Sequence, residues 1–148
     1  MPSLPGSRPA GPARLRLSAT ARVRAYIAGR YTARFRLRPI RERIRALGID
    51  CRSAWIDNED GDYPVPRERA IVEARRTLAE VGAADIIALD TLDESMTGGR
   101  EVELGIHLGV ALALADPASP PRVILVGPVR NVFHELADVR CPSWSEAI

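Results

Sequence analysis

Residues 84–111 combine a strongly apolar run with carboxylates that could do covalent chemistry. The run ends on Asp90, a polar loop closes on two glycines, and a helix-like segment then carries Glu101 and Glu103 near its start. In a parallel α/β sheet, ligands bind at the carboxyl ends of the strands. A carboxylate at that edge can act as a nucleophile on an electrophilic carbon. The sequence therefore predicts a catalytic site in this segment.

Glu101 and Glu103 are not equally suited to act as the nucleophile. Successive helix positions lie about 100° apart, so Glu101 and Glu103 point in different directions and one of them can face solvent or cap the helix. Gly98 and Gly99 leave free N–H groups at the positive end of the helix dipole. That field favours an ionised carboxylate, which suits a nucleophile better than a general acid. His107, one turn beyond Glu103, fits a packed histidine better than a partner that orients the carboxylate.

Cofactor and metal chemistry are not expected. The turn after the first apolar run has a single glycine, Gly29, and lacks the Gly-x-Gly-x-x-Gly pattern that brings a backbone against a pyrophosphate. The chain contains no lysine, which excludes a Walker-type phosphate loop. Cys51 and Cys141 have no partners at metal-ligand spacing. Gly29 can either admit a sugar or phosphate to the backbone or simply shape a tight turn.

Length and composition favour one cytoplasmic domain. At 148 residues and 46% hydrophobic, the chain can build a core, which we place at residues 21–148. Residues 1–20 contain four prolines and little apolar periodicity, so we expect a disordered leader there. No apolar run is long enough to span a membrane. Both cysteines fit reduced thiols.

Charge is distributed unevenly, and all 21 basic residues are arginine. Residues 1–46 hold 12 arginines and one acid, whereas residues 47–148 hold 9 arginines and 18 acids. The arginines of 34–45 could contact phosphates. Aromatic residues are scarce among them, so a solvated helix face is the better interpretation and a nucleic-acid partner is not expected.

The apolar periodicity predicts an alternating α/β architecture. Strands are expected at 22–28, 49–55, 85–89, 122–126 and 139–140, and helices at 34–47, 67–81 and 100–114, with helical turns within 128–136 and 142–148. Pro39 predicts a kink or a late start in the first helix. The alternation implies a Rossmann-like or flavodoxin-like three-layer sandwich, with a parallel five-stranded sheet in the order 2-1-3-4-5.

Several short motifs occur in a fixed order across residues 22–148. They are Tyr-Ile-Ala-Gly at 26–29, Ala-Asp-Ile-Ile at 84–87, a glycine-bearing loop followed by Glu-Leu-Gly at 103–105, and an ending with a Trp-containing turn. Their order and spacing resemble the nucleoside 2-deoxyribosyltransferase-like family.

This resemblance implies a site and a reaction. Glu103 would be the nucleophile that attacks the anomeric carbon of a 2'-deoxynucleoside, Tyr26 would place a hydroxyl beside it, and Asp90 would line the same cleft as a further catalytic residue. The substrate-binding candidates are Gly29, Arg30, Thr97, Gly98, Gly99 and Asn131. Asn131 resembles a position that reaches the sugar in a neighbouring subunit, which implies a homodimer or a larger homo-oligomer.

One position departs from the family pattern. Members carry an aspartate eight residues before the Ala-Asp pair, where it handles protonation of the base, and this chain has Thr77 there. A hydroxyl cannot act as a general acid near neutral pH. Glu73, one helical turn earlier, is the surrogate acid that we expect, and Glu80, nearly one turn later, is its alternative.

Three functions remain open at this point. The first is glycosyl transfer or hydrolysis at the N-glycosidic bond of (2'-deoxy)nucleosides through a covalent intermediate on Glu103, without a cofactor. The second is hydrolysis of 2'-deoxynucleoside 5'-monophosphates. The third is a nucleotide-binding sensor without catalysis, for which Thr77 would be the reason.

Overall fold

The computed structural model describes residues 22–59, 64–94, 98–114 and 122–148. The predicted leader, residues 1–20, and the binding candidate Thr97 lie outside the described residues. Within the described ranges, each helix is too short or too polar to cross a membrane.

Five parallel strands form the sheet, in the predicted order β2-β1-β3-β4-β5. The strands are β1 (Arg24–Ala28), β2 (Asp50–Cys51), β3 (Ile86–Asp90), β4 (Arg122–Val126) and β5 (Val139–Cys141). The central pairings bring Ala28 opposite Leu89 and Asp90 opposite Val126. The carboxyl ends of β1, β3 and β4 therefore lie together at one edge of the sheet.

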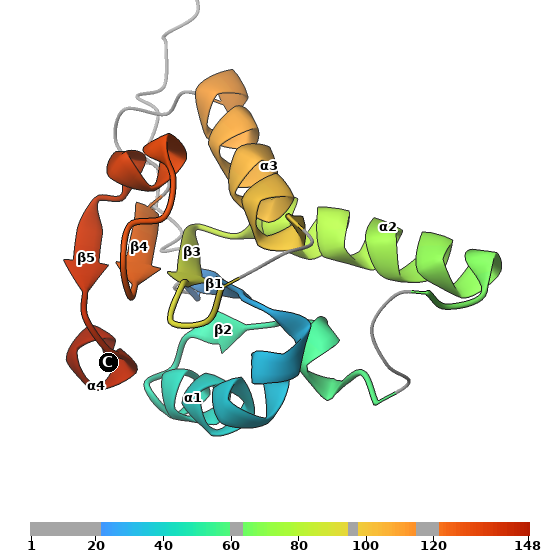
Figure 1. Cartoon of the computed structure of the whole chain (residues 1–148), viewed down its shortest axis with the longest axis horizontal. Coiled ribbons are helices and arrows are strands. Elements are labelled where there is room, and N and C mark those ends of the chain that lie inside the picture. The colour runs from blue at the N-terminus through green and yellow to red at the C-terminus, as the bar shows by residue number, and fades with distance from the viewer. Residues whose placement is uncertain (1–21, 60–63, 95–97, 115–121) are drawn as a thin grey trace, which may run out of the picture.

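Helices cover both faces of the sheet, as Figure 1 shows, with α1 and α4 on one side and α2 and α3 on the other. The helices are α1 (Arg34–Ala46), α2 (Arg67–Ala83), α3 (Gly99–Leu114) and α4 (Trp144–Ala147), and the short 3-10 turns are η1 (Tyr31–Ala33), η2 (Ala54–Asp57) and η3 (Val132–Leu136). The three-layer sandwich expected from the sequence is confirmed.

Side chains alternate between the two faces along each strand. In β1, Ile27 joins the core under α1 and α4, whereas Tyr26 joins the core under α2 and α3. In β3, Ala88 belongs to the α1 side and Leu89 to the α2–α3 side. Because of this alternation, reactive side chains on neighbouring strands can contact each other only when they lie on the same face of the sheet.

The second strand is shorter than the predicted 49–55. Ser53 adopts a left-handed conformation at φ 29°, which ends the extended run, and η2 begins at the next residue. The Ser53 hydroxyl accepts a hydrogen bond from the Ile27 N–H at 2.6 Å. A side chain thus takes the place of a strand carbonyl, and Trp55 lies in the turn instead of the sheet.

Helix α1 begins at Arg34 and runs without interruption through Pro39, so the late start considered from the sequence is wrong. Proline at this position removes one backbone hydrogen bond. Pro39 is exposed, so water can satisfy the carbonyl of the preceding turn. Gly48 follows the helix at φ 85°, as expected for a glycine at a helix end.

Candidate active site

A tyrosine from β1 and a glutamate from α3 meet above the sheet. The Tyr26 hydroxyl donates a hydrogen bond to Oε1 of Glu103 at 2.7 Å. Tyr26 is completely buried and Glu103 is partly buried. The alternation of β1 turns Tyr26 toward α3, and Glu103 lies in the second turn of that helix. Two residues separated by 77 positions in the sequence therefore form one polar pair in an otherwise apolar layer.

The environment of Glu103 differs from the one expected from the helix dipole. Burial raises the pKa of Glu103 to about 7, and the charge of Glu80 adds to this rise, while the Tyr26 hydrogen bond and Arg100 oppose it. Burial therefore shifts Glu103 toward its neutral form and outweighs the dipole effect expected from the sequence. The field of a helix end fades beyond its first turn, and Glu103 lies past it, where desolvation dominates.

Helix α2 brings two further polar groups to the pair. Burial raises the pKa of Tyr26, and the charges of Glu103 and of Glu80 on α2 raise it further, whereas Thr77 on the same helix lowers it. Oε2 of Glu80 accepts a hydrogen bond from the Ala54 N–H at 3.0 Å. Glu80 thus acts on the Tyr26–Glu103 pair through its charge, while its carboxylate is held by the first residue of η2.

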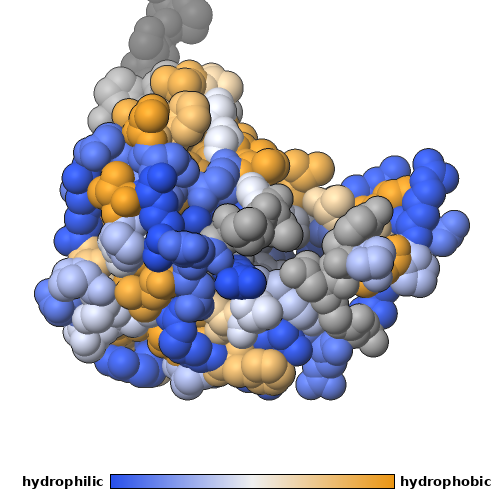
Figure 2. All heavy atoms as spheres, viewed as in Figure 1, coloured by the Kyte–Doolittle hydropathy of each residue, from blue (hydrophilic) through white to orange (hydrophobic). Residues whose placement is uncertain are grey.

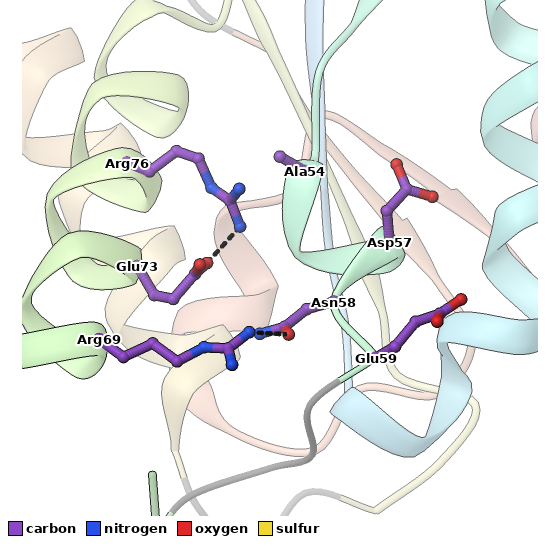
Figure 3. Close-up of a pocket in the computed structure, with 7 residues that line it drawn as sticks. All are labelled: Ala54, Asp57, Asn58, Glu59, Arg69, Glu73 and Arg76. Atoms are coloured by element: carbon purple, nitrogen blue, oxygen red, sulfur yellow. Dashed lines mark hydrogen bonds and ion pairs between the residues drawn. The ribbon is translucent and has the colours of Figure 1, made fainter. Parts of the chain in front are cut away.

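Glu73, the surrogate acid predicted from the sequence, points elsewhere. Its carboxylate pairs with Arg76, and both side chains line a polar pocket of about 380 Å³ between α2 and η2 (Figure 3). Arg69 enters the same pocket and donates a hydrogen bond to Oδ1 of Asn58 at 3.1 Å. The interactions that raise the Glu103 pKa include Glu80 and do not include Glu73.

Asp90 lies on the opposite face of the sheet from the Tyr26–Glu103 pair. Like Ala88, it follows the α1 side of β3, and its side chain is 1% exposed. Arg36 donates to both of its oxygens, at 2.7 and 3.2 Å. The Trp144 indole donates to Oδ2 at 2.6 Å. The structure therefore does not bring Asp90 together with Glu103, and it joins Asp90 to α1 and α4 instead.

Three arginines hold the loop that leads from β3 toward Glu103. Arg36 binds Asp93 at 2.8 Å in addition to Asp90. Arg100, 3% exposed, donates to the carbonyls of Asp90 and Asp93 at 2.9 and 3.2 Å. Arg130 donates to the Thr91 carbonyl at 2.8 Å. Guanidinium groups suit this task because each offers several donors in a fixed plane.

The glycines predicted to bind substrate each have a structural role in the fold itself. A Cβ atom on Gly29, just past β1, would lie 2.9 Å from the Cδ1 of Leu37 and 3.4 Å from the Cβ of Asp90, so a larger residue there would push the Leu37 side chain aside. Gly98 has φ 71°, and its carbonyl accepts the first hydrogen bonds of α3. Gly99 begins α3. Arg30 is exposed just past the carboxyl end of β1, beside the edge where a ligand is expected.

Asn131 caps η3 within its own chain. Its Oδ1 accepts hydrogen bonds from the backbone N–H groups of Phe133 and His134, at 2.9 and 3.3 Å. Nδ1 of the buried His134 accepts from the Arg130 N–H at 3.1 Å, so the ring carries its proton on Nε2. Nε2 then donates to Oε2 of Glu101 at 2.9 Å. Glu101 is thereby joined to η3 and points away from Glu103.

His107 and the cysteines add no metal site. His107 is 2% exposed, and burial lowers its pKa. It lies beside the backbone of Val81 and Arg122, near the amino end of β4 and one helical turn beyond Glu103. Among the described residues, His, Cys, Asp and Glu side chains form no group of three suited to a metal ion.

Sequence reasoning missed the structural roles of the arginines, and it named Glu80 only as the alternative to Glu73. Arg36 and Arg41 belong to the run interpreted as a solvated helix face, yet Arg41 is 3% exposed and binds Asp57 at 2.7 Å. The excess of acids after residue 46 was an available signal, because these acids are the partners of the amino-terminal arginines. No local pattern indicates which arginine binds which acid.

Comparisons with known proteins identify the fold. No protein-family model matches the sequence, and no curated protein matches it. Among solved structures, the chain is similar to a 2-deoxyribosyltransferase from the psychrotolerant bacterium Bacillus psychrosaccharolyticus, with a TM-score of 0.63 and 16% sequence identity. The match covers 84% of this chain and 90% of that one. At this identity the likeness establishes a shared α/β fold.

Proposed function

We propose that this protein transfers or hydrolyses the glycosyl group of (2'-deoxy)nucleosides at the N-glycosidic bond, with Glu103 as the nucleophile. The observation that carries the proposal is the hydrogen bond between Tyr26, in the middle of β1, and Glu103, in the second turn of the helix that follows β3. The likeness in fold to a 2-deoxyribosyltransferase supports the same substrate class.

The chemistry is a double displacement. The Glu103 carboxylate attacks the anomeric carbon, the base departs, and a covalent glycosyl-enzyme ester forms. A second base or water then attacks the same carbon and releases Glu103, so the configuration is retained. With a pKa of about 7, Glu103 is partly ionised at neutral pH, and the ionised fraction is the reactive one. Tyr26 stabilises that ionised form by donating to Oε1.

We assign Asp90 a structural part in this function instead of a catalytic one. Its two oxygens are engaged by Arg36, Trp144 and the Leu92 N–H. A carboxylate with these partners holds the start of the β3–α3 loop. That loop leads to the helix that carries Glu103.

Incubation with a panel of deoxynucleosides and their 5'-monophosphates, with and without an acceptor base, tests the proposal. Base release measured by chromatography is expected for the parent chain and absent for Glu103→Gln, whereas Glu101→Gln keeps most of the activity. Faster release from monophosphates would favour the hydrolase alternative. Binding without any release would favour the sensor and contradict the proposed function.

Intact-protein mass spectrometry tests the covalent step directly. A nucleoside with fluorine at the sugar 2' position slows the second displacement, because fluorine destabilises the oxocarbenium-like transition state. The parent chain is then expected to gain the mass of one fluorinated sugar. Glu103→Gln, which keeps the size of the side chain and loses the nucleophile, is expected to gain none.

We also propose that the protein works as a homodimer or a larger homo-oligomer through α3. Beyond Glu101, each exposed position that the structure describes on this helix is apolar; these positions are Val102, Gly105, Gly109, Leu112 and Ala113. Figure 2 shows hydrophobic surface over α3. A groove of about 320 Å³ between Val102, Leu108 and Phe133 continues this apolar surface toward η3. An exposed helix face made of apolar residues and glycine marks a surface for association with another protein.

A further inference from the structure

Arg100 is a buried cation at the end of α3 where a helix prefers acids. It is the second residue of the helix and is 3% exposed. The positive end of the helix dipole disfavours a cation there, and burial of a charge is unfavourable unless the charge is paired and hydrogen-bonded. Proteins that depart from local preferences in this way tend to do so at functional sites. We propose that Arg100 is a positioning residue, which fastens the start of α3 to the end of β3 and so holds Glu103 beside Tyr26.

This inference rests on the proposed function and adds a residue that acts through Glu103 without touching the substrate. Nη1 of Arg100 donates to the carbonyls of Asp90 and Asp93, at 2.9 and 3.2 Å. Asp90 is the last residue of β3. The guanidinium group therefore joins the first turn of α3 to the carboxyl end of that strand and to the loop that follows it.

The same strand fixes the position of Tyr26. Strands β1 and β3 are paired in parallel, with Tyr26 opposite Ile87. Glu103 follows Arg100 by three positions, so the two side chains lie on the same side of α3, one turn apart. A shift of the first turn of α3 away from β3 would therefore move Glu103 relative to the Tyr26 hydroxyl, which lies 2.7 Å from its Oε1.

Glu101 and η3 hold the other side of the guanidinium group. Nε and Nη2 of Arg100 both donate to Oε1 of Glu101, at 3.0 and 2.7 Å. The buried His134 donates to Oε2 of Glu101 at 2.9 Å and accepts from the Arg130 N–H at 3.1 Å. The Arg130 side chain returns to the β3–α3 loop by donating to the Thr91 carbonyl at 2.8 Å. These contacts form a closed circuit that links α3, η3 and the loop.

The circuit occupies each of the three side-chain nitrogens of Arg100 with a protein acceptor. A buried guanidinium group with these partners is not placed to bind a substrate phosphate. Its charge still reaches the nucleophile, because Arg100 lowers the pKa of Glu103 and opposes the rise caused by burial. Arg100 thus has two separable effects on Glu103, one through geometry and one through charge.

Two substitutions separate these effects. Arg100→Met keeps an unbranched apolar side chain and removes both the planar group and the charge. At the optimal pH of each variant, kcat for base release from a deoxynucleoside is expected to fall about 10²-fold, as for a nucleophile displaced by about 1 Å, with KM unchanged within a few fold. The acid limb of its pH–rate profile is expected to move to higher pH. Arg100→Lys keeps the charge without the planar fork of donors, so kcat should fall while the acid limb stays at the parent position.

Arg41→Met is the matched control. Arg41 is also 3% exposed and donates to Asp57 at 2.7 Å, but it lies on α1, on the other face of the sheet. This variant should lose thermal stability and keep the kcat and the acid limb of the parent chain. Glu101→Gln still offers one oxygen to Arg100, so it should lose far less activity than Arg100→Met.

A measurement without substrate keeps the test independent of the proposed function. Carbon-13 NMR of labelled glutamate carboxyl groups follows the titration of Glu103, whose signal is the one missing in Glu103→Gln. The Glu103 titration should move to higher pH in Arg100→Met and stay unchanged in Arg100→Lys and Arg41→Met.

A parent-like kcat in folded Arg100→Met, or an equal loss of kcat in Arg41→Met, would overturn the positioning role. Arg100→Lys carries the same test if Arg100→Met does not fold, because it also lacks the fork. If the parent chain releases no base, the proposed function fails. The NMR titration then decides the effect of Arg100 on Glu103 by itself, and an unmoved titration in Arg100→Met would overturn that effect.

Discussion

The Tyr26 hydroxyl and the Glu103 carboxylate form a 2.7 Å hydrogen bond in which the donor is completely buried and the acceptor is close to half protonation at neutral pH. Two opposing effects set this balance. Burial disfavours the charge on Glu103, and the hydroxyl stabilises it. Small changes on either side therefore move the ionised fraction of Glu103 within the physiological pH range.

Tyr26→Phe is expected to shift the reaction to higher pH. The substitution removes the donor that stabilises the Glu103 carboxylate, so the pKa of Glu103 rises further above 7. A hydrogen bond to a charged group contributes about 1.5–3 kcal/mol, which corresponds to a shift of roughly one to two pH units. The acid limb of the pH–rate profile measures it. Tyr31→Phe is the control, because the Tyr31 hydroxyl donates to the Asn58 carbonyl; an unmoved limb in Tyr26→Phe would contradict the prediction.

Glu103→Gln is expected to stabilise the fold at alkaline pH. The Glu103 pKa is about 7 in the folded chain against 4.5 for the model carboxyl group, so the folded state binds the proton more tightly. Stability contributed by this site is present below about pH 4.5 and is lost as pH rises through 7, by up to ~3 kcal/mol. Glutamine carries no charge and removes this dependence.

Thermal melts from about pH 5 to about pH 8 measure the effect without any substrate. The Tm of Glu103→Gln should exceed that of the parent chain by several degrees at the alkaline end, and the gap should narrow toward the acidic end. Glu68→Gln, an exposed glutamate on α2, should melt like the parent at each pH. A gap that stays constant with pH would show that Glu103 is not the titrating group.

The sheet order and nearly every element could be predicted because apolar runs alternate with amphipathic segments along the chain. The face of the sheet on which Asp90 lies could not be predicted. Strands buried on both sides carry apolar residues at every position, so no alternation marks their two faces. With Ile86, Ile87, Ala88 and Leu89 all apolar, the sequence does not indicate whether the next side chain points toward α1 or α3.

The Tyr26–Glu103 pair was anticipated only through the family resemblance. Periodicity predicts β1 and α3. The contact between Tyr26 and Glu103, however, joins residues 77 positions apart and depends on how the chain crosses from one element to the other. Glu80 illustrates the same limit. Its spacing from Thr77 predicts a shared helix face, whereas its hydrogen bond to Ala54 requires the η2 turn, which replaced part of an expected strand.

Loss of the Asp90 carboxylate is expected to destabilise the fold strongly. Asp90→Ala leaves the buried Trp144 indole without its acceptor and leaves the Arg36 guanidinium with Asp93 as its remaining carboxylate partner. Arg36 is 37% exposed and reaches water, so the main cost is that of the unsatisfied buried Trp144 donor, about 1–3 kcal/mol. Urea unfolding measures this loss. Asp50→Ala removes the acceptor of an exposed pair with Arg52 and should cost less than about 1 kcal/mol. Equal costs for the two variants would contradict the role assigned to Asp90.

Interruption of the apolar surface of α3 is expected to separate the oligomer into monomers. Leu112 is 82% exposed, so Leu112→Glu should change the stability of an isolated chain very little. In an assembly joined through α3, the same change buries an unpaired charge, which is strongly unfavourable. Light scattering with size-exclusion chromatography should therefore give an oligomer for the parent and a monomer for Leu112→Glu. Leu47→Glu, at a leucine that is 63% exposed at the end of α1 on the other sheet face, should keep the oligomer. A parent chain that is monomeric at micromolar concentration would contradict the oligomer, and an oligomer that survives Leu112→Glu and dissociates with Leu47→Glu would place the interface away from α3.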